Sequence, residues 1–245
     1  MSVSHNKSLL KGLQVLKEVM NSHEPINANT LCARLDIDKS TMSRLITTLM
    51  SEGFIKYVEN TKEIIYADVM GNISKKNRQE LIIKHTENIL NEVFTLTNEC
   101  AYIAIYDEGM SLNLNQIDNS NRVLKNRNTV GSHTPLHISA MGKVILAYTD
   151  IDVTTLDLSE FTSKTITGIK RLRYELVKIE GQGFAIADEE FEYGLRSLAI
   201  PYFSKGGEFI GAIGVSGLAN RLPVEKFPQY ANDMIKIASK NPISF

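Results

Sequence analysis

The chain has 245 residues, which is enough for one large domain or two smaller ones with a sizeable hydrophobic core. Its formal net charge of −1 excludes a polycation, so a nucleic-acid contact would need a local basic patch. The two cysteines, Cys32 and Cys100, exclude a disulfide framework and a zinc-finger spacing. We expect both to be reduced, small core residues.

Nothing in the sequence has the length and hydrophobicity of a targeting or membrane segment. No apolar run approaches the roughly 20 residues of a membrane span. Residues 1–7 lack the apolar stretch of a signal peptide. The sequence therefore predicts a soluble, cytoplasmic protein with no membrane partner.

Two helices are predicted at the start of the chain. Apolar residues at helical spacing indicate the first, from about residue 8 to residue 21: Leu9, Leu13, Leu16 and Met20. Pro25 breaks the chain after it. A shorter helix opens at residues 27–29 and runs through Leu35, and residues 36–38 form a tight connector to the next element.

The third predicted helix has two contrasting faces. Asp38 is a good N-cap whose charge favours a helix N-terminus, and Gly53 ends the helix. One face is an apolar stripe at the spacing i, i+3, i+4, i+7: Met42, Leu45, Ile46 and Leu49. The other face has cations and hydroxyls but no acid: Lys39, Ser40, Thr41, Ser43, Arg44, Thr47 and Thr48. Such a face suits phosphate oxygens and base edges in a DNA groove, and Ser43, Arg44 and Thr47 are the candidates for base contact.

A β-hairpin is predicted directly after these helices. Residues 54–58 and 64–67 are rich in β-branched and aromatic side chains, and residues 59–62 form the turn between them. Three helices followed by a hairpin are the winged form of the helix-turn-helix, in which the third helix enters the major groove. Lys62 is the candidate for a contact between the wing and DNA.

The pattern changes near residue 73, and we place the domain boundary at about Gly71. A long amphipathic helix is predicted from residue 73 to residue 96. Strands are then predicted at 101–106, 111–117, 198–203 and 209–216, and helices at 140–148, 170–181 and 223–239. These elements predict an antiparallel sheet flanked by helices, so the fold class is α+β. The predicted domains are residues 1–70, a linker helix at 71–97, and residues 98–245.

Several short motifs occur in a characteristic order along the chain. In the first 70 residues they are residues 9–20, 39–41, 45–49 and 52–55. In the second half they are residues 137–143, 183–184, 188–196, 211–217 and 221–222. The ordered set, over almost the whole length of the chain, resembles the IclR family of bacterial transcription regulators.

The resemblance implies a GAF-like effector-binding domain behind a winged helix-turn-helix. It also implies a homodimer or homotetramer that binds a partly palindromic, double-stranded DNA operator. Members of the family respond to small metabolites, often carboxylates such as keto acids, sugar acids or aromatic acids, and some repress while others activate. We expect a regulator that represses a catabolic operon, takes a small-molecule effector, needs no further cofactor and is not an enzyme.

The resemblance also implies an effector site. The helix that starts near residue 140 offers backbone N–H groups and a positive dipole end to a carboxylate, and Gly142 would let a ligand approach the backbone. Carried over by position, the site residues are Ala140, Met141, Ala187, Ser197, Gly214 and Ser216, and Gly142 and the rim candidate Asp188 are added to them. The family often has Asp at the position of Ala187, Cys at that of Ser197 and Ser at that of Gly214. These departures predict a roomier, less polar site and a ligand bulkier than a two- or three-carbon keto acid.

Structural roles are the alternative for several of these residues. Residues 188–190 are typical of a solvated loop, and Arg196 of a salt bridge. Ser216 is able to satisfy a local backbone group, and Gly214 to serve close strand packing.

Other function classes have less support in the sequence. His133 and His137 have the spacing of a metal pair, but Pro135 lies between them and no acid or cysteine is nearby in the sequence. No phosphate-cradling loop or nucleophile elbow is present. Two alternatives stay open: an enzyme built on the second half, and a ligand-binding protein whose first half no longer reads DNA.

Overall fold

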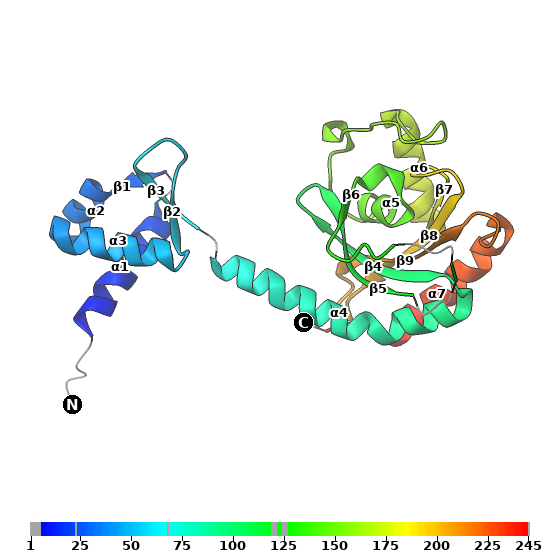
Figure 1. The fold of residues 1–245 in the computed structure, drawn as a ribbon, viewed down its shortest axis with the longest axis horizontal. Helices are drawn as coiled ribbons and strands as arrows, with labels where there is room; N and C mark the ends of the chain where they lie inside the picture. The colour runs from blue at the N-terminus through cyan, green and yellow to red at the C-terminus, as the bar shows by residue number, and fades with distance from the viewer. Residues whose placement is uncertain (1–5, 23, 68, 119–121, 124–126, 245) are drawn as a thin grey trace. The chain divides into compact units, whose positions relative to one another are not determined.

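A computed structural model describes residues 6–22, 24–67, 69–118, 122–123 and 127–244 (Figure 1). Residues 1–5 of the N-terminal segment, where no signal peptide is expected, lie outside the described residues. The chain forms two compact units, Met1–Arg78 and Gln79–Phe245, and each is described by itself.

The first unit is a three-helix bundle with a small sheet. Its helices are α1 (Lys7–Asn21), α2 (Ala28–Leu35) and α3 (Lys39–Ser51). Its strands are β1 (Ile26–Asn27), β2 (Ile55–Tyr57) and β3 (Glu63–Tyr66), in the antiparallel order β1-β3-β2. The three helices and the hairpin are as predicted, whereas β1 is an element that the sequence pattern did not indicate.

Local side-chain bonds begin these helices at the predicted places. Asn27 caps α2 by accepting from the backbone N–H of Thr30 at 2.9 Å. Asp38 caps α3 by accepting from the N–H of Thr41, also at 2.9 Å. Asp36 ends α2 in the left-handed conformation with φ of 50°, a conformation that Asp adopts more readily than most residues. The tight connector between α2 and α3 therefore follows from its acidic residues.

Helix α1 is present, but of the four residues that indicated it only Leu16 packs against the core. Leu9, Leu13 and Met20 are 62, 48 and 51% exposed. The buried side chains of α1 are Val15 and Val19, which belong to the same hydrophobic cluster as buried residues of α2 and α3. The unit therefore leaves a row of large apolar side chains on the outer side of α1.

The second unit is a six-stranded antiparallel sheet with the order β6-β5-β4-β9-β8-β7. Its strands are β4 (Cys100–Asp107), β5 (Met110–Ile117), β6 (His133–Thr134), β7 (Ala185–Asp188), β8 (Leu195–Phe203) and β9 (Phe209–Leu218). Its helices are the second part of α4 (Val69–Thr97), α5 (Ala140–Ala147), α6 (Ile169–Gln182) and α7 (Phe227–Lys240). Short 3-10 turns lie at Leu136–Ile138, Val153–Thr155 and Val224–Lys226.

These elements match the predicted antiparallel sheet and its helices, with two differences. The short strands β6 and β7 were not predicted. Helix α4 begins at Val69, so the boundary expected at Gly71 falls inside the helix and not before it.

Helices cover both faces of this sheet (Figure 1). On the face toward α4 and α7, large side chains such as Leu198, Ile213 and Val215 form one core cluster. On the face toward α5 and α6, the strands contribute small residues: Ala185, Ala187, Ala199 and Ala212. Because small side chains let a helix come close, α5 packs directly on the middle strands of the sheet.

A buried carboxylate joins two loop ends of this unit. Glu99, 4% exposed, lies between α4 and β4 and accepts from Nε and Nη2 of Arg221 at 2.7 and 2.9 Å. Arg122 donates to the same carboxylate. A Cβ atom at Gly217 would lie 2.3 Å from Oε2 of Glu99, so a larger residue there would require the carboxylate to shift. Glu99 thus fixes the segment after β9 and the loop around Arg122.

We expect Glu99→Ala to lower the free energy of unfolding by about 2–3 kcal/mol, because it leaves two guanidinium groups without their acceptor. The matched control is Asp233→Ala, which removes the partner of the exposed Lys236 and should change the free energy by about 0.5 kcal/mol or less. Urea unfolding measures both. Equal effects of the two substitutions would show that the Glu99 cluster does not hold the fold.

Candidate DNA-binding and ligand-binding sites

Helix α3 presents the predicted polar face to solvent. Met42 and Ile46 are buried, which turns six of the seven predicted side chains outward: Lys39, Ser40, Ser43, Arg44, Thr47 and Thr48. Thr41, the seventh, is half-buried. Asp38 accepts from the N–H of Thr41 and from Oγ of Ser40, and these bonds hold the pKa of Asp38 well below its usual value. The first turn of α3 is therefore rigid and its cap is charged at neutral pH.

The side chains on this face differ in whether their hydrogen-bond donors are already used within the protein. Thr47 donates its hydroxyl to the carbonyl of Ser43 at 2.9 Å, and Thr48 donates to that of Arg44 at 3.0 Å. These hydroxyls therefore remain acceptors only. Within the part of the chain that the structure describes, the side chains of Lys39, Ser43 and Arg44 have no protein partner. A cation and a hydroxyl that are free in this way suit base edges, and Lys39 suits a phosphate.

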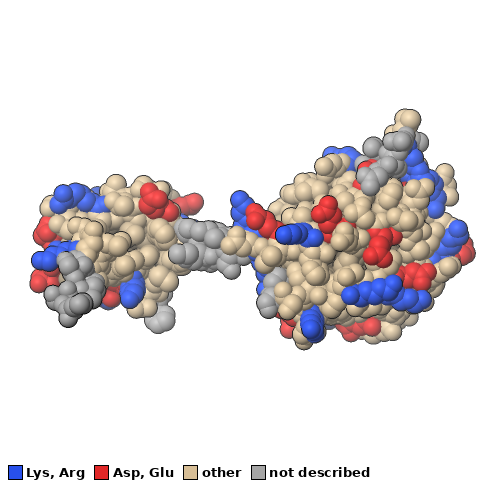
Figure 2. Space-filling view, turned by 90° about the horizontal axis from the view of Figure 1, so that it is seen from below, with Lys and Arg blue, Asp and Glu red and all other residues tan. Residues whose placement is uncertain are grey.

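The β2–β3 turn carries Lys62 on its exposed surface. Asn60 has φ of 61°, which closes the turn, and Glu59 and Glu63 flank the lysine. The negative charges of these two glutamates offset the positive charge of Lys62 in the β2–β3 hairpin. Elsewhere charge is mixed: Figure 2 shows basic and acidic side chains interspersed over the face that it presents.

The strand register brings the carried-over ligand residues together on the sheet face toward α5. Cys100, Ser216, Ser197 and Ala187 are neighbours across four strands and form one row. The backbone N–H of Ala140, at the start of α5, donates to Oγ of Ser197 at 3.3 Å. The row therefore faces the N-terminus of α5, and Cys100 is a member that the resemblance did not supply.

Met141 fills the space that we expected to be open. Gly214 lies in the next row, between Tyr102 and Ala199. A Cβ atom at Gly214 would lie 2.8 Å from Cγ of Met141 and 3.2 Å from its Sδ. At Gly214 the structure leaves no extra room, because a methionine from the facing helix fills the space beside the glycine.

Gly142 has a packing role that the sequence reading missed. A Cβ atom there would lie 2.2 Å from the carbonyl oxygen of Leu136. Its N–H donates to Oγ of Ser139, the N-cap of α5, at 3.0 Å. The glycine therefore admits the backbone of the preceding turn, and its expected role at a ligand stays a prediction.

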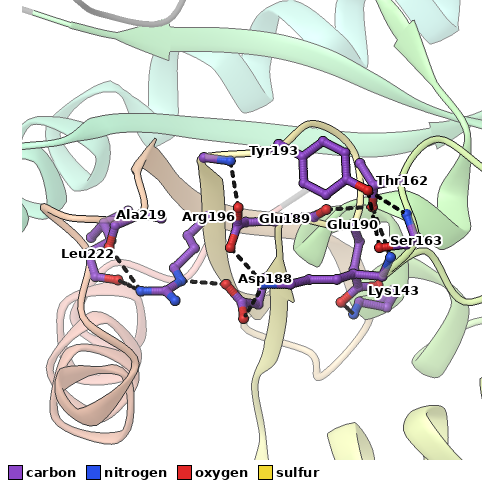
Figure 3. A network of polar contacts seen from close by, with 12 residues as sticks. Lys143, Thr162, Ser163, Asp188, Glu189, Glu190, Tyr193, Arg196, Ala219 and Leu222 are labelled. Carbon is purple, nitrogen blue, oxygen red and sulfur yellow. Dashed lines mark hydrogen bonds and ion pairs between the residues drawn. The ribbon is translucent and has the colours of Figure 1, made fainter.

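Asp188 and Arg196 form an ion pair at the edge of the sheet (Figure 3). Arg196 also donates to the carbonyls of Ala219 and Leu222 at 2.9 and 3.3 Å, so its role is the structural one that we considered. Burial raises the pKa of Asp188, but the bond from Arg196 and the nearby Lys164 outweigh it and lower the pKa overall. Asp188 is therefore ionised and already paired.

Glu189 and Glu190 are not a solvated loop, which corrects the sequence reading. Glu189 accepts from Nζ of Lys164 at 2.6 Å and from the N–H of Gly194 at 2.7 Å. Glu190 is buried and accepts from Nζ of the fully buried Lys143 at 2.7 Å. Figure 3 shows both carboxylates within one polar network. The signal for it was a lysine inside an otherwise apolar helix.

The Glu190 carboxylate is only half satisfied. Its Oε2 is buried without a partner among the described residues, and Glu175 lies 3.9 Å from Nζ of Lys143. Burial therefore raises the pKa of Glu190, and the charge of Lys143 offsets part of this rise. Such a pair holds α5 to the turn at residues 189–194 at the cost of desolvation.

The two candidate metal ligands have other partners. Nε2 of His133 lies 2.8 Å from Oδ2 of Asp107, so an acid is nearby after all, contributed by the β4–β5 hairpin. Nε2 of His137 lies 3.0 Å from the carbonyl of Ser159. No group of three metal-binding side chains occurs among the described residues. In the same part of the chain, every helix is too short or too polar to cross a membrane.

Comparison with known proteins identifies both units. Residues 8–59 match the family model described as the IclR helix-turn-helix domain, and residues 76–242 match that of the bacterial transcriptional regulator IclR C-terminal domain. The transcriptional repressor IclR of Escherichia coli is 25% identical over 98% of this chain and 90% of its own length. The acetate operon repressor of Salmonella typhimurium is 24% identical over the same shares of the two chains. The crystal structure of the Thermotoga maritima IclR has the same fold, with a TM-score of 0.62, 20% identity, and coverage of 96% of this chain and 97% of that chain.

We expect Gly142→Ala to lower the free energy of unfolding by about 2–3 kcal/mol, because the added methyl group would collide with the Leu136 carbonyl. Gly181→Ala, in open space on α6, is the matched control and should raise it by about 0.5 kcal/mol. Thermal unfolding compares them. If Gly142→Ala left the free energy of unfolding unchanged, close packing would not explain the glycine and a ligand contact would.

We expect Lys143→Met to lower the free energy of unfolding by about 3 kcal/mol at pH 8, because Glu190 is left buried and unpaired. The loss should shrink as the pH falls toward 4.5, the ordinary pKa of glutamate. The reason is that the folded variant, with the pKa of Glu190 raised, binds a proton in this range before the unfolded chain does.

Denaturant titrations from pH 4.5 to pH 8 measure this dependence. Lys178→Met, on the exposed face of α6, is the control and should show almost no change at either pH. A loss for Lys143→Met that is independent of pH would mean that Glu190 does not carry the effect.

Proposed function

Because this chain belongs to the IclR family of bacterial transcriptional regulators, we propose that it represses a catabolic operon in response to a small carboxylate. The family consists of DNA-binding regulators, not enzymes, so a catalytic role for the second half is set aside. The names of the two relatives, a transcriptional repressor and an acetate operon repressor, support repression and a carboxylate-related operon.

The exposed polar face of α3 is the observation that carries the DNA-binding part of the proposal. Its cap is rigid, its apolar stripe is buried, and Ser43 and Arg44 are free to reach base edges. Lys39 and Lys62 are the proposed phosphate contacts, supported by their exposure. In a homodimer or homotetramer, two copies of α3 would enter successive major grooves about 34 Å apart.

The row of small polar residues facing α5 supports the ligand-binding part. Ser197 and Ser216 bring hydroxyls to the N-terminus of an eight-residue helix, where a carboxylate is favoured. Ala140, Met141, Ala187 and Gly214 provide the apolar remainder, and Asp188 lies at the rim. The proposed effector is therefore a carboxylate held by its charged end.

We expect Arg44→Ala to weaken operator binding by about 1–3 kcal/mol, because a guanidinium group that reads a base edge contributes about this much. Fluorescence anisotropy with a duplex from the region upstream of the protein's own gene measures it at a fixed salt concentration. A scrambled duplex gives the non-specific affinity.

Lys236→Ala is the matched control, since it removes an exposed cation from α7 and should leave the affinity unchanged. An unchanged midpoint for Arg44→Ala would refute the base contact. Equal, weak binding of the wild type to both duplexes would instead favour a ligand-binding protein whose first unit has lost DNA recognition.

A further inference from the structure

We infer that the exposed face of α6 binds an acidic amphipathic helix of another protein. The inference goes beyond the proposed function, because it involves neither the polar face of α3 nor the row of residues near the start of α5. We call this surface the docking face. Its residues, all exposed, are Lys170, Arg171, Tyr174, Val177, Lys178 and Gly181.

Two large apolar side chains stand in solvent at the centre of the docking face. Tyr174 and Val177 are 74 and 66% exposed, more than any other large apolar side chain in residues 127–244. They are three residues apart on the helix, so their side chains adjoin. Such a pair on the surface marks a contact site more often than a single exposed residue does, and tyrosine is enriched in protein interfaces.

The rest of α6 is fixed, so the docking face is presented by a rigid helix. Leu172, Leu176 and Ile179 point the other way and are buried in the core cluster that includes α5. Gly183 ends the helix with φ of 80° and donates its N–H to the carbonyl of Ile179 at 2.8 Å. A partner therefore binds without the cost of ordering this helix.

The docking face has the geometry of a helix-pairing stripe. At 100° per residue, Lys170, Tyr174, Val177 and Gly181 fall within a sector about 60° wide. Their spacing of four, three and four residues is that of the a and d positions of a heptad. A Cβ atom at Gly181 would have no neighbouring atom within 4 Å, so a second backbone is able to approach closely there.

Cations border this stripe on one side. Arg171 and Lys178 are seven residues apart, at the e positions of the same heptad. Within the part of the chain that the structure describes, neither they nor Lys170 has a hydrogen-bond or ion-pair partner. Three unpaired cations on a chain with a net charge of −1 are a local basic surface that acidic side chains complement.

The two acids of α6 do not belong to this side of the stripe. Glu175 is half-buried and lies 3.9 Å from Nζ of the buried Lys143. Glu180 lies on the opposite side of the stripe, as does Arg173, which is close enough to Asp152 for their charges to interact. The positive charge beside Tyr174 is therefore not neutralised by the helix itself.

Charge and exposed apolar surface together decide between possible partners. A second copy of α6 is disfavoured, because Lys178 would face a cation of the other copy: Arg173 in a parallel pair or Arg171 in an antiparallel pair. DNA phosphates would use the cations but leave Tyr174 and Val177 in water. A helix with an apolar stripe and carboxylates beside it covers the apolar pair and neutralises the cations.

A labelled peptide of three heptads, with leucine at a and d, glutamate at e and g and alanine elsewhere, tests the inference. Fluorescence anisotropy at a fixed salt concentration measures its binding to the full chain. Saturable binding is expected. A peptide of the same charge with serine in place of leucine should bind at least about tenfold more weakly, because the apolar contact is lost.

Two changes in the protein test the two halves of the docking face. Arg171→Glu combined with Lys178→Glu should weaken binding of the glutamate peptide at least about tenfold and should create binding of a peptide with lysine at e and g. The control is Lys236→Glu combined with Lys240→Glu on α7, which should change neither affinity.

Tyr174→Ser should weaken binding of the glutamate peptide by about three- to tenfold, because an exposed ring no longer covers the apolar stripe of the peptide. Tyr106→Ser, at a tyrosine that is 45% exposed on β4, is its control and should have no effect. Melting curves establish that each variant is folded, and Tyr174→Ser keeps the test decisive where the double variant does not fold.

Several results would overturn the inference. One is the absence of saturable binding, and another is equal binding of the leucine and serine peptides. A loss of operator affinity in the Arg171→Glu, Lys178→Glu variant, with no peptide binding, would assign the docking face to DNA phosphates. A change of sedimentation coefficient on Tyr174→Ser would assign it to a second copy of the chain. The proposed function is tested separately by Arg44→Ala.

Discussion

The close approach of α5 to the sheet is the constraint on which the second unit depends. The strands beneath the helix contribute Ala185, Ala199, Ala212 and Gly214, and the helix itself is small at Ala140 and Gly142. Any larger residue at Gly142 meets the Leu136 carbonyl, and any side chain at Gly214 meets Met141. The helix is thereby held where its N-terminus faces the row of Ser197 and Ser216.

Local patterns predicted most of the elements, because helices and hairpins are specified by neighbouring residues. The caps at Asn27 and Asp38 and the hairpin turns around Asn60 and Gly109 are all short-range signals. Of the strands that the pattern missed, β1 and β6 are two residues long and β7 is four, and each pairs with a longer strand. Such strands are too short to show an alternation of polar and apolar residues in the sequence.

The sequence was less informative wherever a residue's role depends on a distant partner. Helical spacing identified α1, but the burial of Val15 and Val19 in place of Leu9 and Leu13 is decided by the packing of α2 and α3. The sequence pattern of residues 188–190 is typical of a solvated loop. In the structure Glu190 is buried against Lys143, a residue that is distant in the sequence. Which neighbour fills the space beside a glycine is likewise a tertiary fact, as Gly142 and Gly214 show.

Helix α5 also connects the proposed site to the rest of its unit. Its first turn carries Met141 and the N–H of Ala140, which donates to Ser197. Lys143, two residues after Met141, is paired with Glu190. Glu190 belongs to the turn that continues into Arg196, which donates to the carbonyls of Ala219 and Leu222.

A ligand at the proposed site would therefore contact a helix whose next polar contact is a buried, half-satisfied ion pair. Such a pair tolerates little displacement, since separating its charges leaves Glu190 unpaired. Movement of the helix start would therefore disturb the turn that carries Glu190. For this to regulate DNA binding, the ligand must bind the two arrangements of the turn with different affinity.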